Sequence, residues 1–219
     1  MKLRNKFKDE DLNRIRAAVK EAEDAISGEI VPVIVERSGD YDQARYKSSL
    51  VFGAVSFVVM ILLDRYVIDP SHTLYYDPMF IFFVVTIFSL LGYFLPDFST
   101  PLKRFFLSQA VMDECTRQKA EACFLEEEVF NTKQRTGIMI FISFFEHEVI
   151  IIADKGISKV VEQKEWDAMV ANLISFIRQD KVVEGLEAGI KRCGAILLEK
   201  GFHKAADDIN ELGDELRIS

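Results

Sequence analysis

Two long apolar segments, without a single charged residue, dominate the pattern of hydrophobic and polar positions. The first covers residues 48–63 and the second 79–95, and apolar side chains occur all around each predicted helix rather than on one stripe. The pattern predicts a transmembrane hairpin with helices at about 48–66 and 79–95, the second ending at Pro96. Because each charge-free run has only about 16–17 residues, two buried core helices are the alternative.

Basic residues on either side of the hairpin predict how it lies in the membrane. Arg45 and Lys47 precede the first segment, and Lys103 and Arg104 follow the second, whereas the connecting loop is acidic. Cytoplasmic flanks carry the excess of Lys and Arg. We therefore expect an integral membrane protein with two spans, with both termini cytoplasmic and the short loop 67–78 outside.

Outside the hairpin, some segments have apolar residues at helical spacing and others have short apolar runs typical of strands, as expected for an α/β domain. Residues 9–27 repeat with a helical period, and residues 29–35 form a short apolar run of the kind that buried strands show. Pro32 lacks a backbone N–H, so it favours an edge strand or a bulge. Residues 137–145 and 149–153, joined by a polar turn, predict an antiparallel β-hairpin.

Three further helices are expected around these strands. Residues 99–101, Ser-Thr-Pro, are typical of a helix start, and this helix is expected to continue to the acidic triplet at 126–128. Apolar faces predict two more helices, around 166–177 and 183–197. The last residues, 203–219, form a polar, acidic tail that is helical at best.

The elements on the two sides of the apolar hairpin belong to one domain. One helix and one strand precede the hairpin, whereas the rest of the predicted sheet follows it. We expect an α/β fold that is interrupted by the two-helix hairpin. The expected boundaries are 1–47 for the N-terminal part of the domain, 48–95 for the hairpin, 96–202 for the main part and 203–219 for the tail.

The net charge and the cysteine content argue against several classes of function. The chain of 219 residues has a net charge of −8, which argues against nucleic-acid binding, because phosphate contacts need clustered Lys and Arg. Cys115, Cys123 and Cys193 match no zinc or redox spacing and fit a reducing compartment as free thiols. Residues 1–20 contain no apolar run, so no signal peptide is expected there.

Asp154 and Gly156 mark the best candidate site in the sequence. They follow directly on the second strand of the predicted β-hairpin, and strand ends in α/β sheets often bind ligands. A carboxylate with loop carbonyls suits a hard divalent cation, Ca²⁺ or another, so these two residues are the predicted metal ligands. The alternative is that Asp154 caps its own loop. No catalytic residue is predicted.

Other titratable residues of the predicted sheet are weaker candidates. Glu29 begins the first strand and is expected near Asp154. Glu146, His147 and Glu148 form the turn at the opposite end of the β-hairpin, so they cannot share a site with Asp154. His147 is a lone turn histidine, and an exposed or structural role is the expected one.

Several segments of the chain resemble the TPM domain family. They are Ala22-Glu23, Ser27 to Ile30, Thr132 to Gly137, Ile150 to Ile157, Trp166, Glu184-Gly185 and Gly189-Ile190. The family includes thylakoid phosphatase-like and photosystem-associated proteins and a receptor-modulating membrane protein. The chain looks like the branch in which a membrane hairpin interrupts the domain.

The resemblance to TPM domains implies both a fold and a range of functions. The implied fold is a mixed sheet flanked by helices. The implied functions are acid phosphatase activity, divalent-ion binding, and assembly or maintenance of membrane complexes. Among the residues of this sequence, only Asp154, with Gly156 in its loop, matches a family position that we connect with the bound ion. Family members usually face the outside of the cytoplasmic membrane or a lumen, behind a signal peptide, and this sequence departs from that pattern.

Two functions compete at this point. The first is a membrane-anchored interaction module that helps the assembly or maintenance of a membrane protein complex and binds a divalent cation. The alternative is a metal-dependent phosphomonoesterase that uses Asp154. The sequence offers no acid/base pair for the chemistry, which favours the module. The expected partners are the lipid bilayer and an unidentified membrane protein complex, without nucleic acid, and the sequence leaves a homo-oligomer open.

Overall fold

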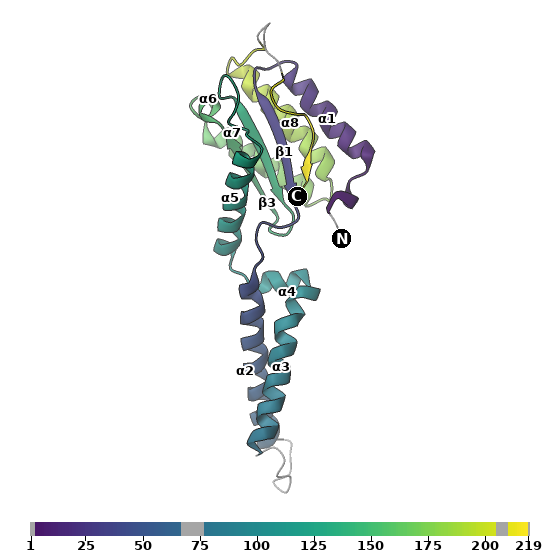
Figure 1. Cartoon of the computed structure of the whole chain (residues 1–219), viewed down its shortest axis with the longest axis vertical. Coiled ribbons are helices and arrows are strands. Elements are labelled where there is room, and N and C mark those ends of the chain that lie inside the picture. The colour runs from purple at the N-terminus through teal and green to yellow at the C-terminus, as the bar shows by residue number, and fades with distance from the viewer. Residues whose placement is uncertain (1–2, 67–76, 205–209, 219) are drawn as a thin grey trace. The chain divides into compact units, whose positions relative to one another are not determined.

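The computed structural model describes residues 3–66, 77–204 and 210–218. The chain divides into two compact units, one of which combines Met1–Gly39 with Asp113–Ser219 and is called the domain here. The other unit, Asp40–Met112, contains the two apolar helices and is called the hairpin (Figure 1). The hairpin is therefore an insertion within the domain along the chain.

A mixed sheet forms the centre of the domain, as expected, and it has four strands, of which the sequence predicts three. Its order is β3-β2-β1-β4, in which β1 runs parallel to β2 and β4, while β2 and β3 are antiparallel. The strands are β1 Glu29–Val35, β2 Gly137–Ser143, β3 Glu148–Ala153 and β4 Arg217–Ile218. The predicted β-hairpin of β2 and β3 is confirmed, with His147 at positive φ in its turn.

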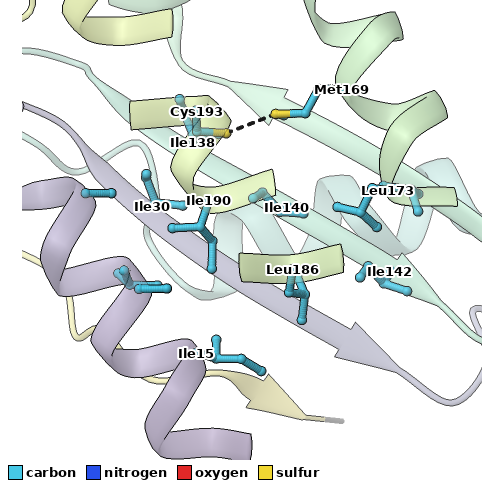
Figure 2. Packing of buried hydrophobic residues seen from close by; sticks show 14 of the residues in the cluster. Ile15, Ile30, Ile138, Ile140, Ile142, Met169, Leu173, Leu186, Ile190 and Cys193 are labelled. Carbon is cyan, nitrogen blue, oxygen red and sulfur yellow. Dashed lines mark hydrogen bonds between the residues drawn. The ribbon is translucent and has the colours of Figure 1, made fainter. Parts of the chain in front are cut away.

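Three helices cover one face of the sheet. Alternate residues of β1 and β2, such as Ile30 and Ile140, lie in one buried cluster with Leu186 and Ile190 (Figure 2). These side chains share a face because successive strand residues point to opposite sides. The helices are α1 Asp9–Glu23, α7 Gln163–Ile177 and α8 Val182–Glu199.

The opposite face of the sheet packs against α5, which spans Gln109–Glu126. Val31 and Phe141 from the sheet lie in a second buried cluster with Ala120 and Cys123 of this helix. Both faces of β1 and β2 are therefore covered. Because neither face meets water, these strands show continuous apolar runs instead of alternation.

The hairpin contains the two long apolar helices that the sequence predicts. They are α2 Asp42–Tyr66 and α3 Pro78–Phe98, followed by the short α4 Thr100–Phe105. Residues 67–76 of the predicted outer loop lie outside the described residues. Pro96 does not end α3, which continues to Phe98, so that prediction is wrong.

Two further expectations about the helices are corrected. The helix that begins after Ser99 does not continue to residue 126, because α4 ends at Phe105. The carbonyl of Ser108 then accepts the first hydrogen bonds of α5, and serine is a favoured residue at a helix start. The first helix also stops at Glu23 rather than at residue 27.

The C-terminal segment is not helical where it is described, which corrects the expectation for the tail. Residues 210–218 end in β4, which pairs with Val33 and Ile34 of β1. Leu212, Leu216 and Ile218 contact the buried clusters, and these contacts favour an extended segment. Consequently β1 is not the outermost strand, and its pairing with β2 has no bulge, although Pro32 predicted one or the other.

Candidate functional site

Asp154 lies at the end of β3, where it begins the short helix α6, Lys155–Ser158. Its side chain is buried, with a residue exposure of 5%. One carboxylate oxygen accepts a hydrogen bond from the backbone N–H of Lys155 at 2.7 Å. Asp154 is therefore the N-cap of α6, which was the structural alternative to a metal ligand.

The other carboxylate oxygen of Asp154 forms an ion pair with Arg135, at 2.8 Å from its Nε. Arg135 belongs to the loop before β2 and adopts a positive φ of 58°. Its guanidinium also lies over the ring of Phe130, at 5.7 Å from the ring centroid. From the sequence Arg135 is expected to be no more than a surface charge. It lies two residues before β2, whereas Asp154 directly follows β3, and the antiparallel pairing of the two strands brings these positions together.

Gly156 holds the loop after β3 against the loop before β2. Its N–H donates to the carbonyl of Arg135 at 3.0 Å. A Cβ at this position would lie 2.5 Å from that carbonyl oxygen and 2.8 Å from the carbonyl oxygen of Gln134. Glycine is therefore required here for a close approach of two backbones rather than for a special φ.

The predicted cation at Asp154 and Gly156 must be weighed against these contacts. Both carboxylate oxygens of Asp154 already face a hydrogen-bond donor or a cationic side chain. In the described parts of the chain, no group of three or more His, Cys, Asp or Glu residues is arranged to hold a metal ion. As they stand, the residues around Asp154 do not fit a metal centre, and a cation there would have to displace Arg135.

Glu29 lies at the same end of the sheet as Asp154, as expected from the sequence. Both residues flank Gly137, which pairs with Glu29 and accepts a hydrogen bond from the Asp154 N–H. However, the Glu29 carboxylate accepts hydrogen bonds from the N–H groups of Glu211 and Leu212, at 3.0 and 3.3 Å. Glu29 thus binds the C-terminal segment, and Asp154 binds Arg135.

Glu146 and Glu148 lie at the opposite end of the β-hairpin from Asp154, so the prediction that they share no site with it is confirmed. The Glu146 side chain is buried and accepts hydrogen bonds from the Ser38 N–H, at 2.8 Å, and from the Ser143 hydroxyl. Burial, and after it the neighbouring Asp113, raise the pKa of Glu148 to about 7.

Glu23 is a buried carboxyl group that the sequence reasoning missed. Its residue exposure is 7%, and one oxygen accepts the Ile30 N–H at 2.8 Å, while the described residues offer no hydrogen-bond donor to the other. Burial, and then the charges of Glu29 and Asp214, raise its pKa to about 8. A cavity of about 120 Å³ adjoins it, lined by Lys20, Glu23, Asp24, Ile26, Gly28, Glu29, Lys204, Asn210 and Asp214.

The three cysteines are free thiols, and the most deeply buried of them is unsuited to nucleophilic chemistry. Cys193 is fully buried between α8 and α7, with its Sγ 3.5 Å from the sulfur of Met169 (Figure 2). Burial raises the pKa of its thiol to about 12. Because the thiolate is the reactive form, Cys193 is a packing residue.

Within the hairpin, small residues bring α2 and α3 together. A Cβ on Gly53 would lie 2.3 Å from the Ser89 hydroxyl oxygen, and a Cβ on Gly92 would lie 2.7 Å from the Phe52 Cβ. Small residues at helix contacts are typical of membrane helices, because packing replaces the hydrophobic driving force there. A shallow lateral groove of about 510 Å³ is lined by Ser49, Phe57, Ile81, Phe82, Val85, Thr86, Ser89, Leu90 and Tyr93.

Comparison with known proteins relates this chain to one family and one solved structure. The TPM domain family matches residues 82–196, which is more than half of the chain. The NMR structure of the BA42 protein from the psychrophilic bacterium Bizionia argentinensis has a TM-score of 0.59 and 19% identity, covering 97% of this chain and 95% of that chain. This likeness shows the fold. No curated protein matches the sequence.

Proposed function

Because the chain belongs to the TPM domain family, we propose that it is a membrane-anchored interaction module built on this domain. In this proposal the hairpin anchors the chain in a lipid bilayer, and the domain binds a partner. Its role is the assembly or maintenance of a membrane protein complex. Basic residues near the start of α2 and after α3, such as Arg45 and Lys103, support cytoplasmic termini.

The exposure of α2 and α3 carries the membrane part of the proposal. In their most apolar stretches only 17% and 6% of the residues are buried. A core helix of a soluble protein would bury most of such residues, whereas a membrane helix presents them to lipid. Large apolar side chains such as Val58, Leu62 and Phe83 are about half exposed, and contiguous apolar surface of this kind marks an interaction with membrane or protein.

Polar contacts at one end of the hairpin support a membrane boundary there. Arg45 Nε lies 3.0 Å from the Asp97 carboxylate, and Lys103 Nζ lies 3.8 Å from it. Tyr46 and Tyr93 form an edge-on pair at the same end, with ring centroids 5.8 Å apart. Paired charges and tyrosines are typical of the interface between lipid and water.

The contacts of the candidate site support binding over catalysis. Asp154 caps a helix and pairs with Arg135, and Glu146 accepts hydrogen bonds from neighbouring groups. Groups that already have such partners serve structure more readily than they serve a reaction. A divalent cation, Ca²⁺ or another, remains part of the proposal as a ligand that competes with Arg135 for Asp154.

The test is phosphomonoester turnover by the purified full-length chain in detergent. It is run with Ca²⁺, Mg²⁺ or Mn²⁺ and without added metal, beside Asp154→Asn, with folding checked by Trp166 fluorescence. The interaction module predicts no turnover above a mock preparation under any of these conditions. Metal-dependent turnover that disappears in Asp154→Asn would overturn it and establish the phosphomonoesterase.

A further inference from the structure

The two edges of the sheet differ in how well they are protected from pairing with another strand. The edge on the β1 side is well protected. The Ile30 N–H, which points away from β2, donates to the Glu23 carboxyl group at 2.8 Å. Pro32, the next residue on that side, has no N–H to offer. β4 then covers Val33 and Ile34. Because of the Glu23 side chain, Pro32 and β4, few backbone groups on this edge of β1 are left for another chain to pair with.

β3 forms the other edge of the sheet, and in the described parts of the chain only β2 pairs with it. Asp154 N–H donates to the carbonyl of Gly137, at 2.9 Å. This bond determines which residues of β3 direct their N–H and C=O groups toward β2 and which direct them away. It follows that Val149, Ile151 and Ala153 direct their backbone groups away from β2. The Ala153 carbonyl accepts the Ser158 hydroxyl at 2.7 Å.

The sequence of β3 has none of the features that usually protect an edge. Between Glu148 and Asp154 it reads Val-Ile-Ile-Ile-Ala, without proline, glycine or lysine, and its pairing with β2 is regular. Val149 is buried and the other four residues are only partly buried. A regular, apolar edge strand with outward N–H and C=O groups is a template for pairing with a further strand.

Charge distinguishes the two ends of this edge. Glu148 stands at the start of β3, with Glu146 and Asp113 close enough to interact with it electrostatically. At the other end Asp154 is compensated by Arg135. The start of β3 is therefore the end where a cationic side chain of a neighbouring strand gains most.

We propose that the β3 edge binds an extended segment of a partner protein, which adds to the sheet as a fifth strand antiparallel to β3. The segment is apolar, and it carries Lys or Arg near its C-terminal end, beside Glu148. This inference rests on the proposed interaction function and names its docking surface. Main-chain hydrogen bonds of this kind supply affinity, while alternate side chains supply specificity.

A second copy of this chain fits the edge less well than such a partner. Antiparallel pairing of two β3 strands, centred on Ile151, places Glu148 of one copy opposite Asp154 of the other. Because Arg135 already neutralises Asp154, Glu148 meets no unpaired cation in that arrangement, whereas opposite charges that face each other across two strands are stabilising. The charge pattern therefore favours a different, basic segment as the occupant.

Two short peptides test the proposal on the full-length chain in detergent. Both are acetylated and amidated and alternate valine with threonine; one ends in lysine and the other in glutamate. Binding is followed through the backbone amide NMR signals of Val149, Ile151 and Ala153. The lysine peptide should shift these signals and bind about two- to fivefold more tightly than the glutamate peptide, as expected for one cross-strand charge pair.

Two variants make the test specific to the edge. Ala153→Pro removes an outward N–H without touching the ladder to β2, so it should abolish binding, whereas Ala153→Ser keeps the N–H and should bind normally. Glu148→Lys should reverse the preference, so that the glutamate peptide binds better. This reversal is readable even if Ala153→Pro fails to fold.

Four results would overturn the proposal. Three of them are the absence of saturable binding, signal shifts confined to residues away from β3, and equal binding to Ala153→Pro that is folded. Shifts at the same amides on concentrating the chain alone would also overturn it, by identifying a second copy as the occupant. Failure of the proposed function is a separate result, since phosphatase turnover does not depend on these peptides.

Discussion

The carboxyl group of Glu23 accepts the backbone N–H of Ile30, at 2.8 Å, from a position that is almost completely shielded from water. Its pKa is raised from an ordinary 4.5 to about 8, mainly by burial. Between these two pH values the folded protein binds a proton that the unfolded chain has lost, so stability falls as pH rises. We predict that the free energy of unfolding decreases from pH 4.5 to pH 8 and that Glu23→Gln flattens the decrease.

The measurement is urea unfolding of the full chain in detergent, followed by the fluorescence of Trp166, the single tryptophan, which lies in the core of the domain. Glu148 acts in the same direction, because its pKa is also raised, to about 7. Glu148→Gln is therefore the matched control and should remove the part of the decrease below pH 7. A Glu23→Gln protein with the full wild-type slope would contradict the assignment.

The contact of Gly156 with the loop before β2 predicts a loss of stability on substitution. In Gly156→Ala the new methyl group meets the Arg135 carbonyl oxygen at 2.5 Å, so one of the two loops has to move. Overpacking of this kind costs about 1–3 kcal/mol. Gly213→Ala is the control, since among the described residues its Cβ would meet the Arg217 side chain alone, at an ordinary contact distance of 3.7 Å. Equal unfolding midpoints for the two variants would refute the close approach.

Arg135 neutralises the buried carboxylate of Asp154, and its removal should be costly. Because the Arg135 side chain is 47% exposed, we expect Arg135→Ala to lose about 1–2 kcal/mol, less than for a fully buried pair. The same variant tests whether a divalent cation binds to Asp154. If Ca²⁺ competes with Arg135, thermal stabilisation by Ca²⁺ should increase in Arg135→Ala and be absent in Asp154→Asn. An unchanged response in both variants would remove Asp154 as the ligand.

Gly92 allows α3 to approach α2 within the hairpin. A Cβ there would lie 2.8 Å from the Ser48 carbonyl oxygen, so Gly92→Ile should push the helices apart at a cost of about 1–3 kcal/mol. The helical signal of the hairpin should then melt earlier, while the Trp166 transition of the domain stays in place. A shift of the Trp166 midpoint by the same amount would show that the two units do not unfold separately.

The sequence predicts those parts of the fold that have a strong local pattern. The uncharged runs predict α2 and α3, and the β-branched segments around the turn at His147 predict β2 and β3. A sustained pattern of hydrophobic residues allows such elements to be predicted without any knowledge of tertiary contacts.

What the sequence does not predict depends on contacts between distant residues. β4 has two residues and follows a polar tail, so no periodicity reveals it, and it forms because β1 and the buried clusters are there to pair with it. The candidate site shows the same limit. Asp154 was found at a strand end, but its partner Arg135 becomes visible only through the antiparallel register, and Glu23 only through its burial beside β1.

Membrane anchoring is the central claim, and alkaline extraction of membranes that contain the full-length chain tests it most directly. The account predicts that the wild-type chain stays in the membrane pellet at high pH. A variant with Val58→Arg and Phe83→Arg, at exposed positions of α2 and α3, should be released, because charged side chains are costly inside a bilayer, with about 2.5–3.5 kcal/mol for an arginine at the centre of a membrane helix. Recovery of the wild-type chain in the alkaline supernatant would contradict the anchor and leave α2 and α3 as surfaces for protein contacts.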